Sequence, residues 1–327
     1  MTSPVGTTTA SVIVCAYTMA RWSQLRDAVT SVLQQEPSAD EVIVVVDHCR
    51  ELEVAAHQDL EPLGVFVVPN VATRGLAGAR NTGVAHARGN IVLFLDDDAI
   101  AQSSWLASHV RHYDDPDVLG VGGLVVPRWE DEAPPWFPPE FGWVVGCSYV
   151  GLPTTTAEIR NPIGANMSFR RSVLELVGGF SESLGRVGAT PRGCEETELS
   201  IRSAAAVPGG RIMHEPGAVV GHHVPRSRAK WTYFRSRCWS EGLSKADVSR
   251  LSDPRRALDR ELTYVTRTLP AAVVQHLAEA VRHREPVRAM RTVSICAGLA
   301  ITSAGYLTGR LRAPDRMPGI ARPGVAG

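Results

Sequence analysis

The chain has 327 residues, of which 44% are hydrophobic and 21% charged, a composition ordinary for a soluble globular enzyme with a substantial core. Its 34 lysine and arginine residues equal its 34 aspartate and glutamate residues, so net charge gives no reason to expect nucleic acid as a partner. Six cysteines without a Cys-x-x-Cys pair argue against a zinc knuckle or a disulfide scaffold, and the first ten residues lack a secretory signal, so we expect a cytoplasmic protein.

The first half of the chain alternates apolar runs with stretches of helical periodicity. The pattern predicts strands at 11–16, 41–46, 65–68 and 91–95, and helices at 22–33, from 51 onward and at 76–88. Near-continuous apolar strands in this order are typical of a mostly parallel sheet flanked by helices on both faces. The N-terminal region is therefore predicted to be an α/β fold of a nucleotide-binding type.

The strand at 91–95 runs directly into three acids, Asp96, Asp97 and Asp98. Two carboxylates ~4 Å apart repel each other by up to ~4 kcal/mol at an effective dielectric constant near 20, and a bound cation removes that cost. Hard divalent ions such as Mg²⁺ or Mn²⁺ prefer carboxylate oxygens and often bind substrate phosphates as well. Because ligands of open α/β sheets bind at the carboxyl ends of strands, the pattern favours a metal and diphosphate site over a screened acidic turn.

A proline-rich segment with large rings follows at 127–139. Trp129, Trp136 and Trp143 could stack on a sugar, or they could pin this crossover to the core. Further strands are expected at 166–170 and 218–220, with a helix at 195–206 between them.

The rest of the chain is expected to be a helical C-terminal extension that is rich in arginine and could face lipid phosphates. Segment 292–309 is uncharged and about long enough to span a membrane, but its Thr, Ser and Gly residues favour a packed or surface-lying helix. The predicted domains are 1–225 (α/β), 226–312 (helical extension) and 313–327 (disordered tail).

Several motifs occur in an order that resembles one enzyme family. They are a first strand ending at Tyr17, a second ending at Asp47, Arg80-Asn81, the three acids, Gly178-Gly179-Phe180, and Glu195-Glu196-Thr197-Glu198-Leu199. Together, over roughly residues 10 to 225, they resemble the family 2 glycosyltransferases of the GT-A fold. The resemblance implies an inverting transferase that uses Mn²⁺ or Mg²⁺. It would move a sugar from a nucleoside-diphosphate sugar to a hydroxyl of a glycan, a lipid-linked molecule or a small molecule.

The resemblance also assigns donor-binding residues. Asp47 matches the acid that hydrogen-bonds the nucleotide base, and Ala16 and Tyr17 line the same pocket. Arg80 and Asn81 match the segment that closes over the nucleotide and its ribose.

Asp96 and Asp98 match the D-x-D acids, of which the first faces the ribose or sugar and the last holds the metal. Asp97 is a further candidate for donor contact. Asn166 matches a segment beneath the donor sugar, or it is a buried strand amide.

Glu196 matches the position of the general base, where the family has Asp, and Glu195 is a rival for this role. His222 or His223 matches a histidine that completes the metal shell. Adjacent strand residues face opposite sides, so only one of the two can point at the site, and a structural role is as open as metal ligation.

The arginines and rings of 226–237 could grip a phosphate or a lipid-linked acceptor, or they could form an amphipathic helix whose rings pack on the first domain. Peripheral membrane contact would place the protein at the inner face of the membrane.

Other classes fit less well. A sugar nucleotidyltransferase needs a glycine-rich N-terminal signature that 14–21 lacks, and a dehydrogenase needs Gly-x-Gly-x-x-Gly after the first strand. A non-catalytic carbohydrate- or nucleotide-binding protein would explain the tryptophans but not three aspartates together with a glutamate pair.

Overall fold

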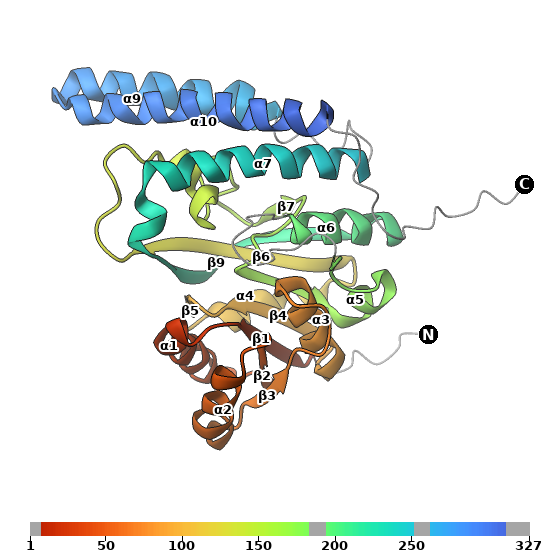
Figure 1. The fold of residues 1–327 in the computed structure, drawn as a ribbon. Coiled ribbons are helices and arrows are strands. Elements are labelled where there is room, and N and C mark those ends of the chain that lie inside the picture. Colours follow the sequence, from red (N-terminus) through yellow and green to blue (C-terminus); the bar gives the residue numbers. More distant parts are fainter. Residues whose placement is uncertain (1–7, 183–193, 252–261, 312–327) are drawn as a thin grey trace, which may run out of the picture.

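The first half of the chain forms the predicted alternation of strands and helices (Figure 1). The computed structural model describes residues 8–182, 194–251 and 262–311, so the tail predicted at 313–327 lies outside the described residues. The N-terminal elements in chain order are β1 (Ala10–Ala16), the short 3-10 helix η1 (Met19–Arg21), α1 (Trp22–Leu33), β2 (Glu41–Val46), α2 (Arg50–Asp59), η2 (Glu61–Leu63), β3 (Phe66–Pro69), α3 (Leu76–His86) and β4 (Ile91–Asp96).

The second half adds strands to the same sheet. Its elements up to residue 224 are β5 (Ala99–Ala101), α4 (Trp105–Val110), η3 (Arg111–Asp114), β6 (Val118–Trp129), η4 (Pro139–Val145), β7 (Ala157–Ile159), β8 (Asn166–Arg170), α5 (Arg171–Val177), α6 (Glu195–Ala206) and β9 (Arg211–Val224). The strand order is β3-β2-β1-β4-β8-β6-β9-β5, with β7 beside β9. The sheet is parallel from β3 to β4, as predicted, and mixed beyond, because β8 runs antiparallel to both β4 and β6.

Strand register places the polar residues that follow β1, β2 and β4 at one edge of the sheet. Ala16 of β1 pairs with Val46 of β2, and Cys15 of β1 pairs with Asp96 of β4. Since these strands are parallel, their carboxyl ends meet, and Tyr17 and Asp47 emerge beside the three acids.

The sheet is buried on both faces. Val12 and Val14 of β1 belong to a core cluster with residues of α1 and α2, whereas Ile13 between them packs in a second cluster with residues of α3 and α5. This alternation follows from the two-residue period of a strand. It explains why β1, β2 and β4 read as continuous apolar runs rather than as alternating patterns.

The described residues after 225 form helices that lie together beyond strands β6 and β9, at the top of Figure 1. They are η5 (Arg226–Ala229), α7 (Trp231–Leu251), the π-helical turn η6 (Tyr264–Thr268), α9 (Leu269–His283) and α10 (Pro286–Leu311). In both views α9 and α10 lie side by side, and α7 separates them from the sheet. Pro270 lies in the first turn of α9 and Pro286 begins α10, positions where a missing backbone N–H is tolerated.

Helix α10 packs closely on α7 through glycines. A Cβ atom added at Gly305 would lie 2.5 Å from the carbonyl oxygen of Trp239, and one at Gly242 would clash with the carbonyl oxygen of Thr302. Small residues at such contacts let two helix backbones approach.

Rings from the proline-rich crossover pack against the start of α7. Trp136 lies 5.1 Å from Trp231 and 5.6 Å from Phe234, measured between ring centroids. This contact fits the interpretation that the crossover is pinned to the core, and Phe234 is fully buried there. The helices after residue 225 thus share the main core, and the domain boundary at 225 stays a prediction.

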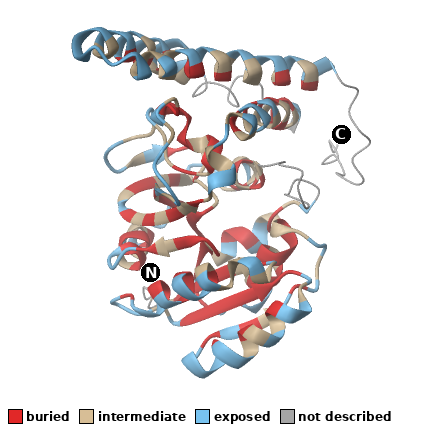
Figure 2. Cartoon of the chain, turned by 60° about the vertical axis from the view of Figure 1, so that its left-hand side comes forward, coloured by how far each residue is buried: buried red, intermediate tan, exposed pale blue. Residues whose placement is uncertain are grey.

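Much of α9 and α10 is exposed, as the pale-blue ribbon of Figure 2 shows, and several of the exposed residues are large and apolar. They are Val274, Leu277 and Val281 of α9, and Val287, Met290, Val293, Leu307 and Leu311 of α10. Among the described helices, α10 alone is long and apolar enough to cross a membrane by length and composition. Its packing on α7 gives it a protein-facing side as well.

Candidate active site

A cavity of about 1240 Å³ opens at the carboxyl ends of β1, β2 and β4 and reaches the C-terminal helices. Its lining includes Asp47 and the three acids at one end, Glu195 and Glu196 of α6, and residues of α7, η6 and α10 at the other end. Ordinary small-molecule sites occupy roughly 300–1,000 Å³, so this cavity has room for more than one reactant.

Asp47 is held rigidly at the end of β2. Its Oδ1 atom accepts a hydrogen bond from Asn70 Nδ2 at 2.7 Å, and its Oδ2 atom accepts one from the Gly75 backbone N–H at 2.9 Å. The adjacent ring of Tyr17 is 52% exposed, and the Arg21 guanidinium lies 5.5 Å from its centroid. This end of the cavity thus offers a fixed carboxylate beside an accessible aromatic face.

The three acids are not equivalent. The side chain of Asp96 is 28% exposed, whereas Asp97 and Asp98 are buried. Arg21 Nη1 lies 2.8 Å from Asp97 Oδ1 and 3.0 Å from Asp98 Oδ2, and His222 Nε2 lies 3.1 Å from Asp98 Oδ1. Arg21 therefore offsets much of the repulsion that the sequence predicts.

Burial and these contacts shift the protonation of the cluster. Burial raises the pKa of Asp97 even though Arg21 opposes the shift. Burial would also raise the pKa of Asp98, but the hydrogen bond and charge of His222, together with Arg21, hold it well below its usual range. Burial would lower the pKa of His222, yet the Asp98 carboxylate raises it to about 10. Both shifts favour an ion pair between the Asp98 carboxylate and the His222 imidazolium.

Asp96, Asp98 and His222 form a group that fits a divalent metal. Their ligand atoms all lie within 4.8 Å of one another. Two carboxylates and an imidazole are a donor set that suits Mn²⁺, and a histidine ligand must be neutral, so metal binding would release the proton of His222.

Arg80 of α3 links Asp96 at the end of β4 to Glu195 of α6. Its Nη1 atom lies 3.3 Å from Glu195 Oε1, and its Nη2 atom lies 3.4 Å from Asp96 Oδ1. Nη2 also donates to the Gly164 carbonyl oxygen at 2.9 Å, and the Phe180 ring centroid lies 5.3 Å from the guanidinium carbon. The other carboxylate oxygen of Glu195 is buried without a hydrogen-bond partner in the described part of the chain.

Glu196 has a different environment from Glu195. No ion pair joins Glu196 to a cation within the described ranges, although it lines the same cavity. Burial and the neighbouring charge of Glu195 raise the pKa of Glu196 to about 8. Cys194, just before the pair, has φ 87°, a left-handed conformation uncommon for a residue other than glycine. The carboxyl group of Glu196 can therefore gain and lose a proton near neutral pH.

The sequence is similar to known proteins of one family. A sequence model described as Glycosyl transferase family 2 matches residues 11–178. A glucosyl-dolichyl phosphate glucuronosyltransferase from Haloferax volcanii is 31% identical over 303 residues, which cover 92% of this chain and 96% of the relative. The chain belongs to glycosyltransferase family 2. The predictions of this family and of a glycosyltransferase enzyme are confirmed.

Solved structures confirm the GT-A fold of this glycosyltransferase. A mannosyltransferase from Pyrobaculum calidifontis, solved in complex with GDP-Man and Mn²⁺, matches with a TM-score of 0.57 and 21% identity, covering 92% of this chain and 88% of that chain. GalNAc-T7, solved with UDP, GalNAc and Mn²⁺, matches with a TM-score of 0.52 and 18% identity, covering 79% of this chain and 55% of that chain. The roles of individual residues stay predictions.

Asn166 of the glycosyltransferase lies apart from the cavity and is fully hydrogen-bonded. Its Oδ1 atom accepts from Trp105 Nε1 at 2.7 Å and contacts His109 Nε2 at 2.8 Å. Its Nδ2 atom donates to the carbonyl oxygens of Leu124 at 3.0 Å and Ala218 at 2.8 Å. The geometry matches the buried strand amide that the sequence left open and departs from a donor-sugar contact.

Asn81 and His223 also depart from their expected places. Asn81 Oδ1 accepts from the Phe180 N–H at 2.8 Å and its Nδ2 donates to the Phe180 carbonyl oxygen at 2.9 Å, so its amide holds this loop rather than lining the cavity. His223 faces a separate cavity of about 170 Å³ beside Gln24 and Arg128. Adjacent residues of a strand point to opposite faces, so His222 alone of the pair lies in the metal-fitting group.

Two arginines complete the acidic site of the glycosyltransferase. Sequence reasoning missed Arg21, which pairs with acids 76 and 77 positions later, and no local pattern signals such a contact. Arg228 comes from the arginine-rich stretch at 226–237, and its Nη2 atom lies 4.0 Å from Asp98 Oδ2.

Proposed function

We propose that this glycosyltransferase moves a sugar, with inversion, from a nucleoside-diphosphate sugar to an acceptor hydroxyl in a reaction that depends on Mn²⁺ or Mg²⁺. The proposal rests on one observation: the metal-fitting group and the Glu195-Glu196 pair line the same cavity. The two structural neighbours, solved with GDP-Man and Mn²⁺ and with UDP and Mn²⁺, support it.

The donor would lie across the carboxyl ends of β1, β2 and β4. Asp47 would accept hydrogen bonds from the nucleotide base, and the exposed ring of Tyr17, with Ala16 beside it, would pack against that base. Asp96, held by Arg80, would face the ribose or the sugar.

Asp98, Asp96 and His222 would hold the metal. A bound divalent ion supplies the positive charge that stabilises a departing diphosphate. Arg228, near Asp98, would add a second positive charge on the phosphate side. Asp97, which Arg21 holds and burial shields, would support the neighbouring acids rather than bind the metal.

Glu196 would accept the proton of the acceptor hydroxyl. Its pKa of about 8 lies close to neutral pH, where a general base is most effective. Arg80 ties Glu195 to the donor side, which leaves Glu196 as the better candidate. A single displacement assisted by this base inverts the anomeric carbon.

We also propose that the enzyme contacts a membrane from the cytoplasmic side through α9 and α10. Val281 at the end of α9 is 80% exposed, and Arg282 and Arg284 follow it. Apolar side chains beside arginines suit an interface with anionic lipids. The relative named for a dolichyl phosphate substrate supports an acceptor carried on a lipid.

A two-step experiment tests the proposal. First, nucleotide sugars are screened for an increase in the thermal unfolding temperature that requires Mn²⁺. Second, the product linkage formed from the stabilising donor is read by NMR. We expect a Mn²⁺-dependent increase and an inverted linkage. No stabilisation by any donor with Mn²⁺ would count against the function, and retention of configuration would refute inversion.

A further inference from the structure

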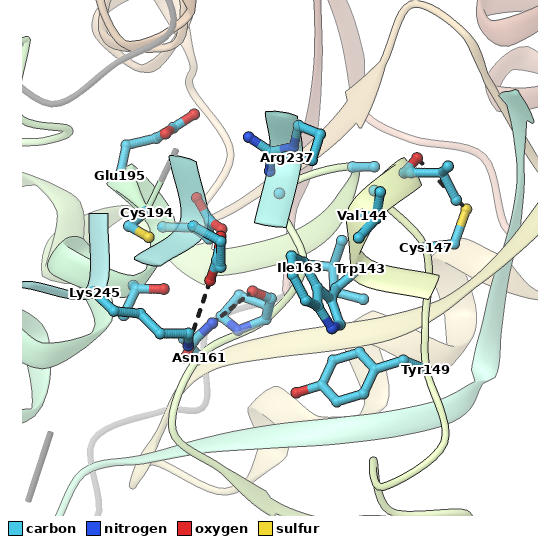
Figure 3. Close-up of a pocket in the computed structure, with 18 of the residues that line it drawn as sticks. Trp143, Val144, Cys147, Tyr149, Asn161, Ile163, Cys194, Glu195, Arg237 and Lys245 are labelled. Atoms are coloured by element: carbon cyan, nitrogen blue, oxygen red, sulfur yellow. Dashed lines mark hydrogen bonds and ion pairs between the residues drawn. The ribbon is translucent and has the colours of Figure 1, made fainter. Parts of the chain in front are cut away.

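The cavity does not end at Glu195 and Glu196. Beyond Glu196 it continues between η4, η6 and α10, where its lining includes Trp143, Leu269, Leu299, Ser303 and Tyr306. We refer to the part lined by these five residues as the helical end. Figure 3 shows the pocket, with Cys194 and Lys245 on one side and Trp143 and Tyr149 on the other.

The helical end differs in chemistry from the donor end. Its walls are mainly rings and aliphatic side chains, and Leu269 is only 2% exposed. Donor-end residues include Asp47 and Asp96, whose carboxylates suit a nucleotide and a metal-bound diphosphate. A polar donor therefore has no complementary groups along most of the helical end, whereas an apolar ligand would remove this surface from water.

Charged residues of α7 also line the cavity, and one of them lies near Glu196. Arg237, Glu241 and Lys245 recur at four-residue spacing and line the cavity from one face of the helix. Lys245 Nζ lies 3.4 Å from Glu241 Oε1, and the charge of Glu241 also acts on Glu196. A ligand reaching from Glu196 into the helical end would first meet polar groups and then apolar ones.

The helical end also continues to the outer surface. Leu307 lines the cavity and is 61% exposed on α10, and Ser303, one turn earlier, is exposed as well. The apolar surface of α9 and α10 thus meets the cavity at this mouth. Because Ser303 and Leu307 line the cavity and are also exposed, a chain buried in the helical end could leave the cavity beside these two described residues.

We infer that the helical end binds the apolar chain of an amphipathic acceptor, that is, a glycosyl acceptor on a lipid carrier. This inference rests on the proposed function, because it places the acceptor's hydroxyl-bearing head beside Glu196. The chain then occupies the space between α10, η6 and Trp143 and leaves through the mouth at Ser303 and Leu307. The enzyme selects acceptors by burying methylenes as well as by recognising the sugar.

The test uses the full chain with Mn²⁺ and alkyl β-glucosides from methyl to octyl as probes, kept below their micelle concentrations. Binding is followed by tryptophan fluorescence and calorimetry. Each buried methylene is worth about a fourfold gain in affinity, so affinity should climb steeply with chain length. Ser303→Trp fills the mouth and should reduce octyl glucoside affinity about tenfold or more while leaving methyl glucoside affinity unchanged.

Ala304→Trp is the matched control, because Ala304 is the next exposed residue of α10 and does not line the cavity. It should keep the wild-type dependence on chain length. Leu307→Ser, at an exposed position that folding should tolerate, should lower octyl affinity by about fourfold. An unchanged dependence in Ser303→Trp and Leu307→Ser, or an equal loss in Ala304→Trp, would overturn the inference.

Failure of the proposed function is separable from failure of the inference. Stabilisation by UDP or GDP with Mn²⁺ is measured on the same variants. If neither nucleotide stabilises the wild type with Mn²⁺, the donor and metal assignment fails whatever the glucosides show. If a nucleotide stabilises all variants equally but chain length has no effect, only the assignment of the helical end fails.

Discussion

Replacing Glu196 by glutamine tests the assignment of the general base most directly. The substitution keeps the shape of the side chain and removes its ability to accept a proton. Glu196 lines the cavity and forms no ion pair within the described segments, so the change breaks no salt bridge. It also removes one of two neighbouring carboxylates, and the fold should tolerate that loss.

The expected loss of transfer rate in Glu196→Gln follows from the role of a general base. A positioned general base contributes about 10²- to 10⁴-fold in rate, which corresponds to about 3–5 kcal/mol in the activation barrier. The pH dependence has a definite sign. Because the base acts when deprotonated and its pKa is about 8, wild-type kcat/KM should rise with pH, reach half its maximum near pH 8 and level off above that pH. Glu196→Gln should lose this rising limb.

Glu195→Gln is the matched control. It removes the negative charge that helps to raise the pKa of Glu196, so the rising limb should move to lower pH rather than disappear. The assay is transfer from the donor found by the stabilisation screen, with donor affinity measured by calorimetry. Glu196→Gln should bind the donor normally. If it retains transfer within about tenfold of wild type, or if Glu195→Gln shows the loss instead, the base is misassigned.

Three further substitutions test the metal, the loop contact and the helix packing. Asp98→Asn removes a carboxylate from the metal-fitting group, so Mn²⁺ should no longer raise nucleotide affinity in calorimetry; an intact Mn²⁺ effect would contradict the ligand assignment. Asn81→Ala leaves the Phe180 N–H and carbonyl groups without their partner, so urea unfolding should show a loss of about 1–3 kcal/mol in the free energy of unfolding, with nucleotide affinity preserved. A selective loss of nucleotide affinity would instead restore the donor role that the sequence predicted for Asn81. Gly305→Leu forces a side chain against the Trp239 carbonyl and should cost about 1–3 kcal/mol through overpacking, seen as a lower thermal midpoint; an unchanged midpoint would show that α7 and α10 can separate.

The sequence predicts the donor end of the site because that end depends on local patterns. Apolar runs identify β1, β2 and β4, and parallel pairing alone brings Tyr17, Asp47 and the acids to one edge. Beyond β4 the local signal weakens. Strand β9 begins at Arg211, well before the segment at 218–220 that the sequence indicates, because its earlier residues include the polar His214 and Glu215.

Local sequence patterns do not predict contacts between segments that are far apart in the chain. Arg21 meets acids 76 and 77 residues later, and Asn166 meets Trp105 and His109 from another element. Whether a polar residue faces a ligand or a protein partner depends on the arrangement of β8, β6 and β9. The sequence shows which polar residues are present, and only the fold decides which of them are left free to contact a ligand.

The bridge made by Arg80 has a consequence for engineering. Arg80 belongs to the segment that carries the proposed donor contacts, whereas Glu195 belongs to the segment that leads into the C-terminal helices. Consider a chimera in which everything after residue 194 is replaced by the same part of a homologue in order to change the acceptor. In that chimera the homologue's residues at positions 195 and 196 would face the original Arg80 guanidinium. Lysine could not replace that guanidinium, since it lacks a planar fork able to reach two acids and a carbonyl at once. Successful grafts should therefore keep or transfer both members of this pair together.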